Sequence, residues 1–251
     1  MAKPKQPRQK PTATTTTPAT PPPPPNWPPL RALPPESQSL TTLLPSQILT
    51  TPLLPSSLCT TYRTFLSTLP LLTTPPSHRS DHAARVNDRF QLHDPVFSSN
   101  LWHTTGLSTL VLSGPVDSLP LSPSDRSDLY GGTVLGLNPN IRIYRYTPGQ
   151  FFAQHYDDSN DVTMPDGTKG RTTWTLLIYL SGPATGCEGG ETVFYPEPAS
   201  RKAPAPAPVV AGLEVGMALL HRHGKECMLH EGREVTQGEK WVIRSDLVVR
   251  R

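Results

Sequence analysis

The stretch that decides the fold is residues 141–160, IRIYRYTPGQFFAQHYDDSN. Its first six residues favour a β-strand, and the apolar run that follows leads directly into a histidine and two aspartates. A buried carboxylate is costly unless a positive charge lies against it. If the strand continues through this run, His155 and Asp157 point to one side and Asp158 points to the other. The pattern predicts an imidazole and a carboxylate that converge on a cation inside a domain of β-strands.

The rest of the chain after Gly131 also indicates a β-rich domain. Short apolar runs alternate with turn signals, the strongest of which is Pro-Asp-Gly at 165–167. Strands without helices between them are typical of an antiparallel sandwich or barrel. The predicted strands lie in the runs IRIYRY, TTWTLLIYL, ETVFY, GMALLH, CMLH and KWVIRSDLVV. We therefore expect residues 131–251 to form one mainly β core.

The chain before this core divides into two parts. Residues 1–38 are rich in proline and threonine and cannot bury enough apolar surface to offset the entropy of ordering. They predict a disordered tail, which is either solvated or used to dock a proline-recognising module with Trp27 as its anchor. Residues 39–130 predict a support region that packs against the core.

The support region should contain two helices and one strand. In SSLCTTYRTFLSTL the apolar side chains share one helical face, with Ser56 or Ser57 as the N-cap and Pro70 as the stop. A shorter helix is expected at 97–107, FSSNLWHTTGL. Between them, ARVNDRF has the alternation of a strand. We expect residues 113–130 to be a connection.

Composition narrows the class of protein. The 251 residues carry a net charge of +3, which is too weak to predict nucleic-acid binding. Three distant cysteines without a CxxC pair fit a reducing compartment better than a disulfide framework. No apolar run approaches the roughly 18 residues of a membrane span, and the basic start lacks the apolar segment of a secretory signal. We expect a cytoplasmic or nuclear protein. A transit peptide is the alternative, but Pro4, Pro7 and Pro11 would break its helix.

A histidine and an aspartate are too few ligands for a metal ion, so a third should lie on a neighbouring strand. Three histidines are candidates, namely His221, His223 and His230. Two histidines and one carboxylate make the facial triad of non-haem Fe(II) oxygenases, whose remaining coordination positions stay open. His230 ends a strand-like run before Glu-Gly, but the residues alone leave the choice among the three open.

Several motifs resemble those of the 2-oxoglutarate- and Fe(II)-dependent dioxygenases, and most of all their prolyl 4-hydroxylase-like branch. RYTPGQFFAQHYD resembles the branch's RYxxGQ and HxD strand, and LLIYLSG with GGETVF resembles a pair of its strands. HEGREVTQGEKW resembles its HxGxxVxxGxKW ending. The matches run in the family's order from about residue 138 to residue 246. The resemblance implies a mainly β double-stranded β-helix, or jelly roll, with the N-terminal helices packed against it. It also implies Fe(II) bound by His155, Asp157 and His230.

The resemblance further implies a site for 2-oxoglutarate, whose 5-carboxylate pairs with a cation. In this branch the cation lies ten residues after the distal histidine, which is Lys240 here. A charged residue in the otherwise apolar strand KWVIRSDLVV also needs a partner, whatever the family. Arg244 shares the strand face and is the rival. By the same resemblance Tyr179, Tyr146 and Thr192 line the site, O2 is the second co-substrate and ascorbate keeps the iron reduced.

The implied function is hydroxylation of a C–H bond on a peptidyl proline or another protein residue, with release of succinate and CO2. A hydroxylase or demethylase of a small molecule or nucleic acid is the alternative, and a non-catalytic jelly-roll binding module is the second. A protein or peptide substrate would enter as an extended segment, with Arg85, Asn87 and Arg89 of one strand face lining its entrance. The segment 161–172, DVTMPDGTKGRT, is expected to close over it as a lid.

Overall fold

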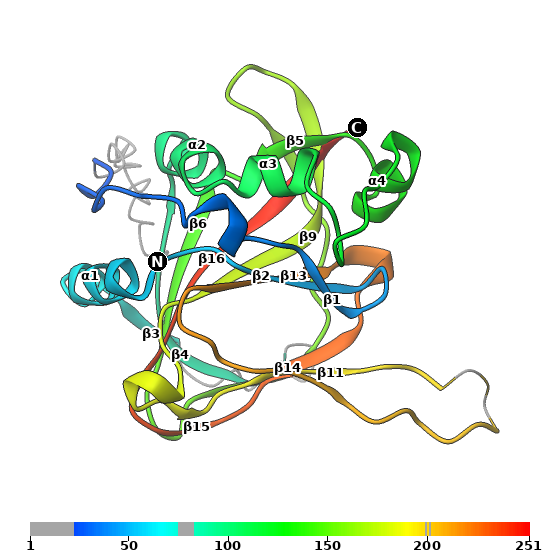
Figure 1. Ribbon diagram of the computed structural model, residues 1–251. Coiled ribbons are helices and arrows are strands. Elements are labelled where there is room, and N and C mark those ends of the chain that lie inside the picture. Colours follow the sequence, from blue (N-terminus) through cyan, green and yellow to red (C-terminus); the bar gives the residue numbers. More distant parts are fainter. Residues whose placement is uncertain (1–22, 75–82, 199, 201) are drawn as a thin grey trace, which may run out of the picture.

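The computed structural model describes residues 23–251 apart from 75–82, 199 and 201. Within these residues the chain is mainly β. Its strands form a nearly closed antiparallel jelly roll whose two sheets share β4 (Arg85–His93), so the predicted fold class is confirmed (Figure 1). The strands of the larger sheet before β4 are, in spatial order, β1 (Thr41–Leu44), β2 (Ile48–Pro52), β13 (Met217–Arg222), β9 (Lys169–Tyr179), β16 (Lys240–Arg250) and β6 (Asn140–Tyr146). The strands of the smaller sheet after β4 are β7 (Phe151–His155), β14 (Leu229–Gly232), β11 (Thr192–Tyr195) and β12 (Val209–Ala211).

Five short strands complete the β structure. Three of them extend strands of the larger sheet, since β3 (Leu72–Thr74) pairs with β4, β5 (Val134–Leu137) with β16 and β8 (Asp161–Thr163) with β9. The remaining two, β10 (Glu188–Gly189) and β15 (Val235–Gln237), pair with each other. The β8–β9 pair is a hairpin that occupies the segment predicted as a lid.

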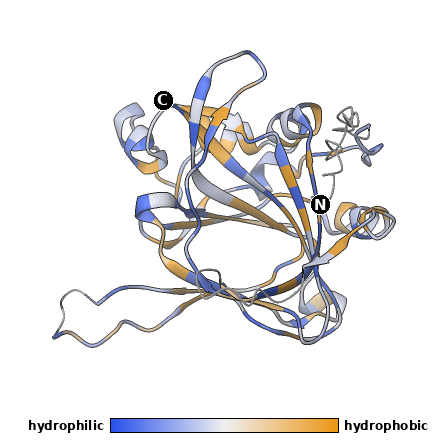
Figure 2. Cartoon of the chain, turned by 180° about the vertical axis from the view of Figure 1, so that it is seen from behind, coloured by the Kyte–Doolittle hydropathy of each residue, from blue (hydrophilic) through white to orange (hydrophobic). Residues whose placement is uncertain are grey.

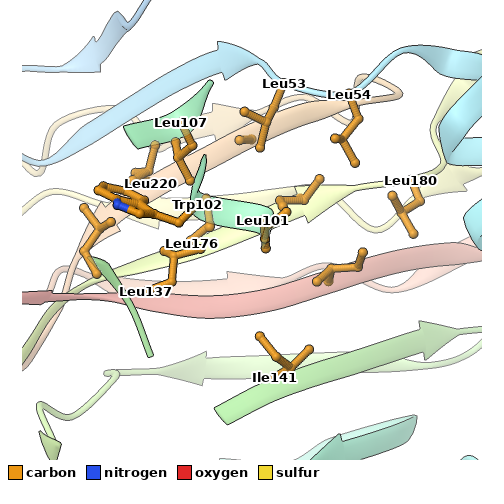
Figure 3. Close-up of a cluster of buried hydrophobic side chains, with 14 of the residues drawn as sticks. Leu53, Leu54, Leu101, Trp102, Leu107, Leu137, Ile141, Leu176, Leu180 and Leu220 are labelled. Carbon is orange, nitrogen blue, oxygen red and sulfur yellow. The ribbon is translucent and has the colours of Figure 1, made fainter. Parts of the chain in front are cut away.

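Helices cover the outer face of the larger sheet (Figure 1). They are α1 (Ser56–Leu66), α2 (Pro95–Thr104), α3 (Leu107–Leu112) and α4 (Pro123–Tyr130). Their apolar faces meet the sheet in the main hydrophobic core, in which leucines and Trp102 interlock between helix and strand (Figure 3). Hydrophobic residues follow the strands and the inward sides of the helices (Figure 2). The predicted packing of N-terminal helices against a β core therefore holds.

Side chains of the central strand β16 point alternately into two different hydrophobic clusters. Trp241, Ile243 and Leu247 point towards the helices and belong to the main core. Val242 belongs instead to a second cluster between the two sheets. Because side chains alternate across a strand, Lys240 and Arg244 share the inward side with Val242. Two charged residues are thereby placed inside the jelly roll.

The register of the larger sheet arranges the inward residues in rows. Lys240 lies opposite Tyr146 on β6, and the next inward pair along the strands is Val242 with Tyr144. Arg89 on β4 lies opposite Tyr144 on its other side. The rows therefore run from Lys240 at one end of the jelly roll towards the arginines at the other.

Two of the four helices agree with the sequence prediction, with shifted bounds. The helix α1 buries the expected face, but its N-cap is Pro55 and it ends four residues before Pro70. The helix α2 begins at Pro95 because the Asp94 side chain accepts a hydrogen bond from the backbone N–H of Phe97 at 2.8 Å.

The prediction that residues 113–130 are only a connection is wrong. Its second half is α4, which has the start and stop signals of a helix. Ser122 is the N-cap and accepts from the N–H of Asp125 at 3.1 Å, Pro123 takes the first helical position, and Gly131 ends the helix in the left-handed conformation. The sequence prediction also missed the helix α3, which has six residues and follows α2 closely.

The prediction of a disordered tail over residues 1–38 is wrong for residues 23–38, the part of it that the structure describes. Residues 1–22 lie outside the described part of the chain, but Trp27 packs on the main core. Its ring stacks on Phe97 with centroids 4.0 Å apart, and its indole N–H donates to Asp94 at 2.8 Å. A tryptophan can bury a large apolar area even when its neighbours are prolines. Trp27 therefore anchors the segment to its own chain, which corrects the hypothesis that it anchors a separate module.

Among the described residues, no helix has the length and apolar character needed to cross a membrane.

Candidate active site

Two histidines are brought face to face by strand pairing. His155 ends β7, and the register of β7 with β14 places His230 directly opposite it. Asp157 follows two residues later, beyond the end of the strand, where its carbonyl accepts from the N–H of Gly224 at 2.8 Å. One nitrogen or oxygen atom from each of these three residues lies within 4.8 Å of the others. The spacing suits ligands that surround one metal ion.

The two imidazoles are oriented by the backbone. Nδ1 of His155 lies 2.8 Å from the carbonyl oxygen of Ala153, and Nδ1 of His230 lies 2.9 Å from that of Met228. A carbonyl only accepts, so each Nδ1 carries the proton and each Nε2 keeps its lone pair. The Nε2 atoms lie 3.8 and 3.9 Å from the two oxygens of Asp157. This is the arrangement in which histidines bind metals through Nε2.

The protonation states at neutral pH also suit a metal. Burial lowers the pKa of His155 to about 3, and it lowers the pKa of His230 as well. Burial alone would raise the pKa of Asp157, but Arg244 and the surrounding histidines outweigh it and hold that pKa well below its ordinary value. Metal binding requires neutral imidazoles and an ionised carboxylate. The residues present therefore fit a divalent metal.

Arg244 reaches the same carboxylate. Its Nη2 atom lies 2.8 Å from Oδ2 of Asp157, and the Thr175 hydroxyl donates to that oxygen at 2.8 Å. Asp158, by contrast, is exposed. The strand alternation that pointed Asp157 inward and Asp158 outward agrees with the structure, although β7 itself stops at His155.

Lys240 lies deeper in the jelly roll, 5% exposed. Its Nζ donates to the carbonyl of Gly190 at 2.6 Å and lies 5.3 and 5.4 Å from the ring centroids of Tyr146 and Tyr179. The Tyr179 hydroxyl is hydrogen-bonded to Thr192 at 2.6 Å. Within the described part of the chain no carboxylate forms an ion pair with Lys240. Burial lowers its pKa to about 8, since a buried ammonium without a counter-ion is disfavoured.

Two cavities share lining residues at the histidine and aspartate cluster. The inner cavity has a volume of about 40 Å³. Of the residues predicted for the site, Lys240, Tyr146, Thr192 and the metal-binding candidates line it. The outer one is an open cleft of about 1350 Å³. The residues that line both cavities are Tyr144, Phe152, His155, Asp157 and Arg244. A molecule in the cleft would therefore face the cluster directly.

The three predicted substrate residues separate in the structure. Arg85 and Arg89 line the outer cleft, over the rings of Phe152 and Tyr144 respectively. Asn87 is fully buried and does not line it. The register explains the difference, because Asp88 pairs with Arg145 and so Asn87 lies in the row of Tyr146, at the deep end of the sheet. The prediction that Asn87 lines the entrance is wrong.

Two residues near the cluster were missed or left undecided by sequence reasoning. Thr175 lies on β9 in a run that predicts only a strand, and nothing in that run indicates contact with Asp157. His221 on β13 was one of three candidates for the third ligand, and it approaches Asp157 as closely as His230 does. His223 instead makes a hydrogen bond to the Thr175 hydroxyl at 3.0 Å.

Part of the chain matches one family of known proteins. Residues 141–245 match the model of the 2OG-Fe(II) oxygenase superfamily. No curated protein matches the chain. The similar solved structures include a collagen prolyl hydroxylase of Paramecium bursaria Chlorella virus-1, which is 17% identical, with 81% of this chain and 96% of that chain covered and a TM-score of 0.47.

Two further prolyl hydroxylases are similar to the same extent. The Pseudomonas putida prolyl-4-hydroxylase is 14% identical, with 81% of this chain and 93% of that chain covered and a TM-score of 0.49. The Trichoplax adhaerens prolyl hydroxylase, in complex with a hypoxia inducible factor fragment, is 17% identical, with 81% and 84% covered and a TM-score of 0.49. The family match covers residues 141–245, which include the candidate metal-binding residues and Lys240. The part of the chain that forms the candidate site therefore matches the 2OG-Fe(II) oxygenase superfamily, a family of dioxygenases whose cofactors are Fe(II) and 2-oxoglutarate.

Proposed function

We propose that this oxygenase is a prolyl 4-hydroxylase-like enzyme that hydroxylates a proline residue of a peptide while 2-oxoglutarate is converted to succinate and CO2. The observation that carries the proposal is a pair of cavities that share a wall. A buried cation lines the inner cavity, His155 and Asp157 line both cavities, and a large open cleft lies outside. The inner cavity suits 2-oxoglutarate, the cluster suits Fe(II) and the outer cleft suits the peptide.

His155, Asp157 and His230 would hold Fe(II) through two Nε2 atoms and a carboxylate oxygen. When bound, the iron supplies the redox chemistry that activates O2. The chain contributes the orientation of the ligands, because backbone carbonyls fix both imidazole rings. Thr175 and Arg244 both hold Oδ2 of Asp157, which favours metal binding through Oδ1.

Lys240 would bind the 5-carboxylate of 2-oxoglutarate. It is a buried cation without an anionic partner among the described residues, and a bound carboxylate would offset its desolvation. Tyr146 and Thr192 line the same cavity and their hydroxyls can donate to that carboxylate, while the Tyr179 hydroxyl is hydrogen-bonded to Thr192. With a volume of about 40 Å³ the inner cavity is much smaller than the outer cleft.

The outer cleft supports a peptide as substrate. Its volume of about 1350 Å³ exceeds the roughly 300–1,000 Å³ of ordinary small-molecule pockets. Arg85 and Arg89 present donors along one wall, which an extended backbone can use as acceptors. The β8–β9 hairpin contributes Asp161, Val162 and Thr163 to the cleft, so its movement would close the substrate in.

The redox environment belongs to the proposal as well. All three cysteines are free thiols, which supports a reducing compartment such as the cytoplasm or nucleus. Ascorbate would serve there as the reductant that returns oxidised iron to Fe(II).

The experiment is turnover with a panel of peptides that contain proline, in the presence of Fe(II), 2-oxoglutarate and ascorbate. A substrate peptide should stimulate succinate release and gain one oxygen atom on proline, as measured by mass spectrometry. Arg89→Ala should weaken peptide binding and spare the KM for 2-oxoglutarate. If nucleosides or free small molecules stimulate turnover and the peptides do not, the substrate is not a peptide, and the alternative hydroxylase or demethylase takes its place.

A further inference from the structure

Four arginines gather on the inward face of the larger sheet, where that face forms a wall of the outer cleft. Arg142 on β6 lies directly opposite Arg244 on β16, and on its other side it lies opposite Gln91 on β4. Arg89 and Arg85 precede Gln91 on the same face of β4. All four arginines line the cleft. Like charges on neighbouring strands destabilise a sheet, so a counter-charge beside each guanidinium is stabilising.

Two of the four arginines have carboxylate partners within the chain. Arg142 forms an ion pair with Asp246. Arg244 forms one with Asp157 at 2.8 Å, and its Nε lies 3.7 Å from Oδ1 of Asp246. The chain itself therefore supplies the counter-charges for the half of the cluster that lies on β6 and β16.

The two arginines on β4 have no such partner among the residues that the structure describes. Cζ of Arg85 lies over the ring of Phe152, 4.9 Å from the centroid. Arg89 donates to the uncharged Oε1 of Gln91 at 2.6 Å, and its Cζ lies 5.8 Å from the ring centroid of Tyr144. Burial, together with the charges of the other three arginines, lowers the pKa of Arg89. This guanidinium is therefore held in a place where a nearby anion would stabilise it.

The acidic residues of the cleft do not supply that anion. Asp157 and Asp246 are held by the two partnered arginines. Asp161, on the β8–β9 hairpin, pairs with Arg251 at 2.7 Å. Asp158 lies in the loop after β7 and forms no ion pair with another described residue. The uncompensated positive charge of the cleft is therefore concentrated on β4.

This charge lies close to the proposed metal site. The ring of Phe152, over which Arg85 lies, stacks on the ring of His155 with centroids 3.5 Å apart. One aromatic side chain thus contacts both the guanidinium and a candidate metal ligand. An extended peptide advances about 3.3 Å per residue. With a proline at the metal, a side chain two or three residues away would reach the arginines of β4.

We propose that Arg85 and Arg89 form a subsite for an anionic side chain of the substrate, so that the preferred peptide carries an acidic residue two or three positions from the proline. The inference rests on the proposed function and specifies its substrate. A carboxylate can accept paired hydrogen bonds from a guanidinium, and its charge offsets the repulsion among the arginines. A peptide backbone accepts hydrogen bonds but brings no net charge. A phosphorylated side chain offers the same chemistry as a carboxylate, and the test distinguishes the two.

The test is binding of fluorescent peptides to the full chain, loaded with Mn(II) and 2-oxoglutarate in the absence of O2 and measured by anisotropy. The peptides share one sequence of alanine and glycine around a single proline. They carry glutamate, glutamine, lysine or phosphoserine at each position up to three residues from it. At the favoured position glutamate should bind roughly tenfold more tightly than glutamine, and lysine should bind most weakly. Added salt should reduce these differences, because it screens exposed charges. Preference for phosphoserine over glutamate would support the subsite and identify phosphate as its ligand.

Reversal of charge at the subsite separates an ion pair from simple hydrogen bonding. Arg89→Gln keeps a donor and removes the charge, so the advantage of glutamate over glutamine should fall. Arg89→Glu should invert the order, so that the lysine peptide binds more tightly than the glutamate peptide. Arg233→Glu is the matched control, because Arg233 is exposed, lines neither cavity and changes the net charge of the chain equally. The control should keep the order of the unmodified protein.

The outcomes separate the inference from the proposed function. Equal binding of the glutamate, glutamine and lysine peptides, followed by hydroxylation of their proline when Fe(II) and O2 are supplied, would overturn the subsite and leave the proposed function intact. A preference for glutamate that Arg89→Glu and Arg233→Glu alter to the same extent would also overturn the subsite. If no peptide binds and none gains oxygen, the proposed function fails and the inference fails with it.

Discussion

At the scale of single residues, Asp157 connects the proposed metal site to the rest of the jelly roll. It accepts from both Thr175 and Arg244, so truncation would also remove the nearest carboxylate from a buried guanidinium. We therefore predict the effect of Asp157→Asn, which keeps the shape of the side chain and removes its charge. The variant should fold and lose Fe(II) binding, measured by calorimetry. Asp158→Asn is the control and should keep the metal, since Asp158 is exposed. Equal loss in both would refute the assignment.

Lys240 and Arg244 should have separable phenotypes. Lys240→Ala removes a charge-assisted hydrogen bond worth ~1.5–3 kcal/mol, so the KM for 2-oxoglutarate should rise roughly 10- to 150-fold. Iron affinity should change little, because Lys240 does not contact the metal-binding candidates. Arg244→Ala should act mainly on metal binding, through Asp157. Steady-state kinetics and calorimetry measure both effects. The reverse pair of phenotypes would mean that Arg244, and not Lys240, binds the 5-carboxylate of 2-oxoglutarate.

Lys240 also predicts a pH dependence. Burial lowers its pKa to about 8, so in the ligand-free protein the cation is present below this pH and is lost above it. The dissociation constant of 2-oxoglutarate should therefore rise above about pH 8, by up to tenfold per pH unit. In Lys240→Arg this dependence should vanish, because arginine stays charged. A pH profile that persists in that variant would assign the titration to another group.

The same shift has a consequence for stability. The ordinary pKa of lysine is 10.5, so between about pH 8 and that value the unfolded chain binds more protons than the folded one. The contribution of Lys240 to the free energy of unfolding should therefore increase as pH rises through this window.

At the scale of elements, one residue joins the tail to a helix. Asp94 caps α2 and accepts from the indole of Trp27. Asp94→Ala should lower the free energy of unfolding by about 2–3 kcal/mol, as the sum of a lost cap and a lost hydrogen bond. Ser122→Ala removes only the exposed cap of α4 and should cost about 1 kcal/mol. Urea denaturation measures both, and equal losses would show that the Trp27 contact contributes nothing.

The sequence predicted the elements whose signals are local. Strand alternation placed Asp157 inward, and the apolar face of α1 was visible in its spacing. The helix α4 was missed although the Ser-Pro-Ser-Asp run at its start is a start signal, because its few apolar residues give no periodic face. Trp27 was missed because its segment has the composition of a tail, whereas its packing depends on a partner seventy residues away.

Features that depend on register could not be predicted. Asn87 alternates with Arg85 and Arg89 in sequence, yet pairing with β6 places it in the deep row. His221, His223 and His230 are equivalent candidates by spacing. Only the arrangement of β13 and β14 on opposite sides of the interior distinguishes them, and that arrangement is set by long-range strand order.

At the scale of the whole molecule, the N-terminal segment should contribute stability and not chemistry. A chain that starts at residue 23 should keep the melting temperature of the full chain. A chain that starts at Ser39 loses the stacking of Trp27 on Phe97 and should melt several degrees lower. Both should retain Fe(II) binding and the slow turnover of 2-oxoglutarate without substrate. Loss of that turnover in both chains would place a functional group in residues 1–22.

If Lys240 binds 2-oxoglutarate as proposed, the strand β16 sets the length of the acid that fits. Lys240 and Arg244 lie four residues apart on its inward side, which fixes their Cα atoms at about 13–14 Å. Because Arg244 is tied to Asp157, this interval also sets the separation between the carboxylate anchor and the metal site. A keto diacid one methylene longer or shorter than 2-oxoglutarate would fail to reach both ends. Discrimination among keto acids by chain length would therefore depend on a buried strand. Exchange of the loops around the cleft could then change the substrate without changing the keto acid that is consumed.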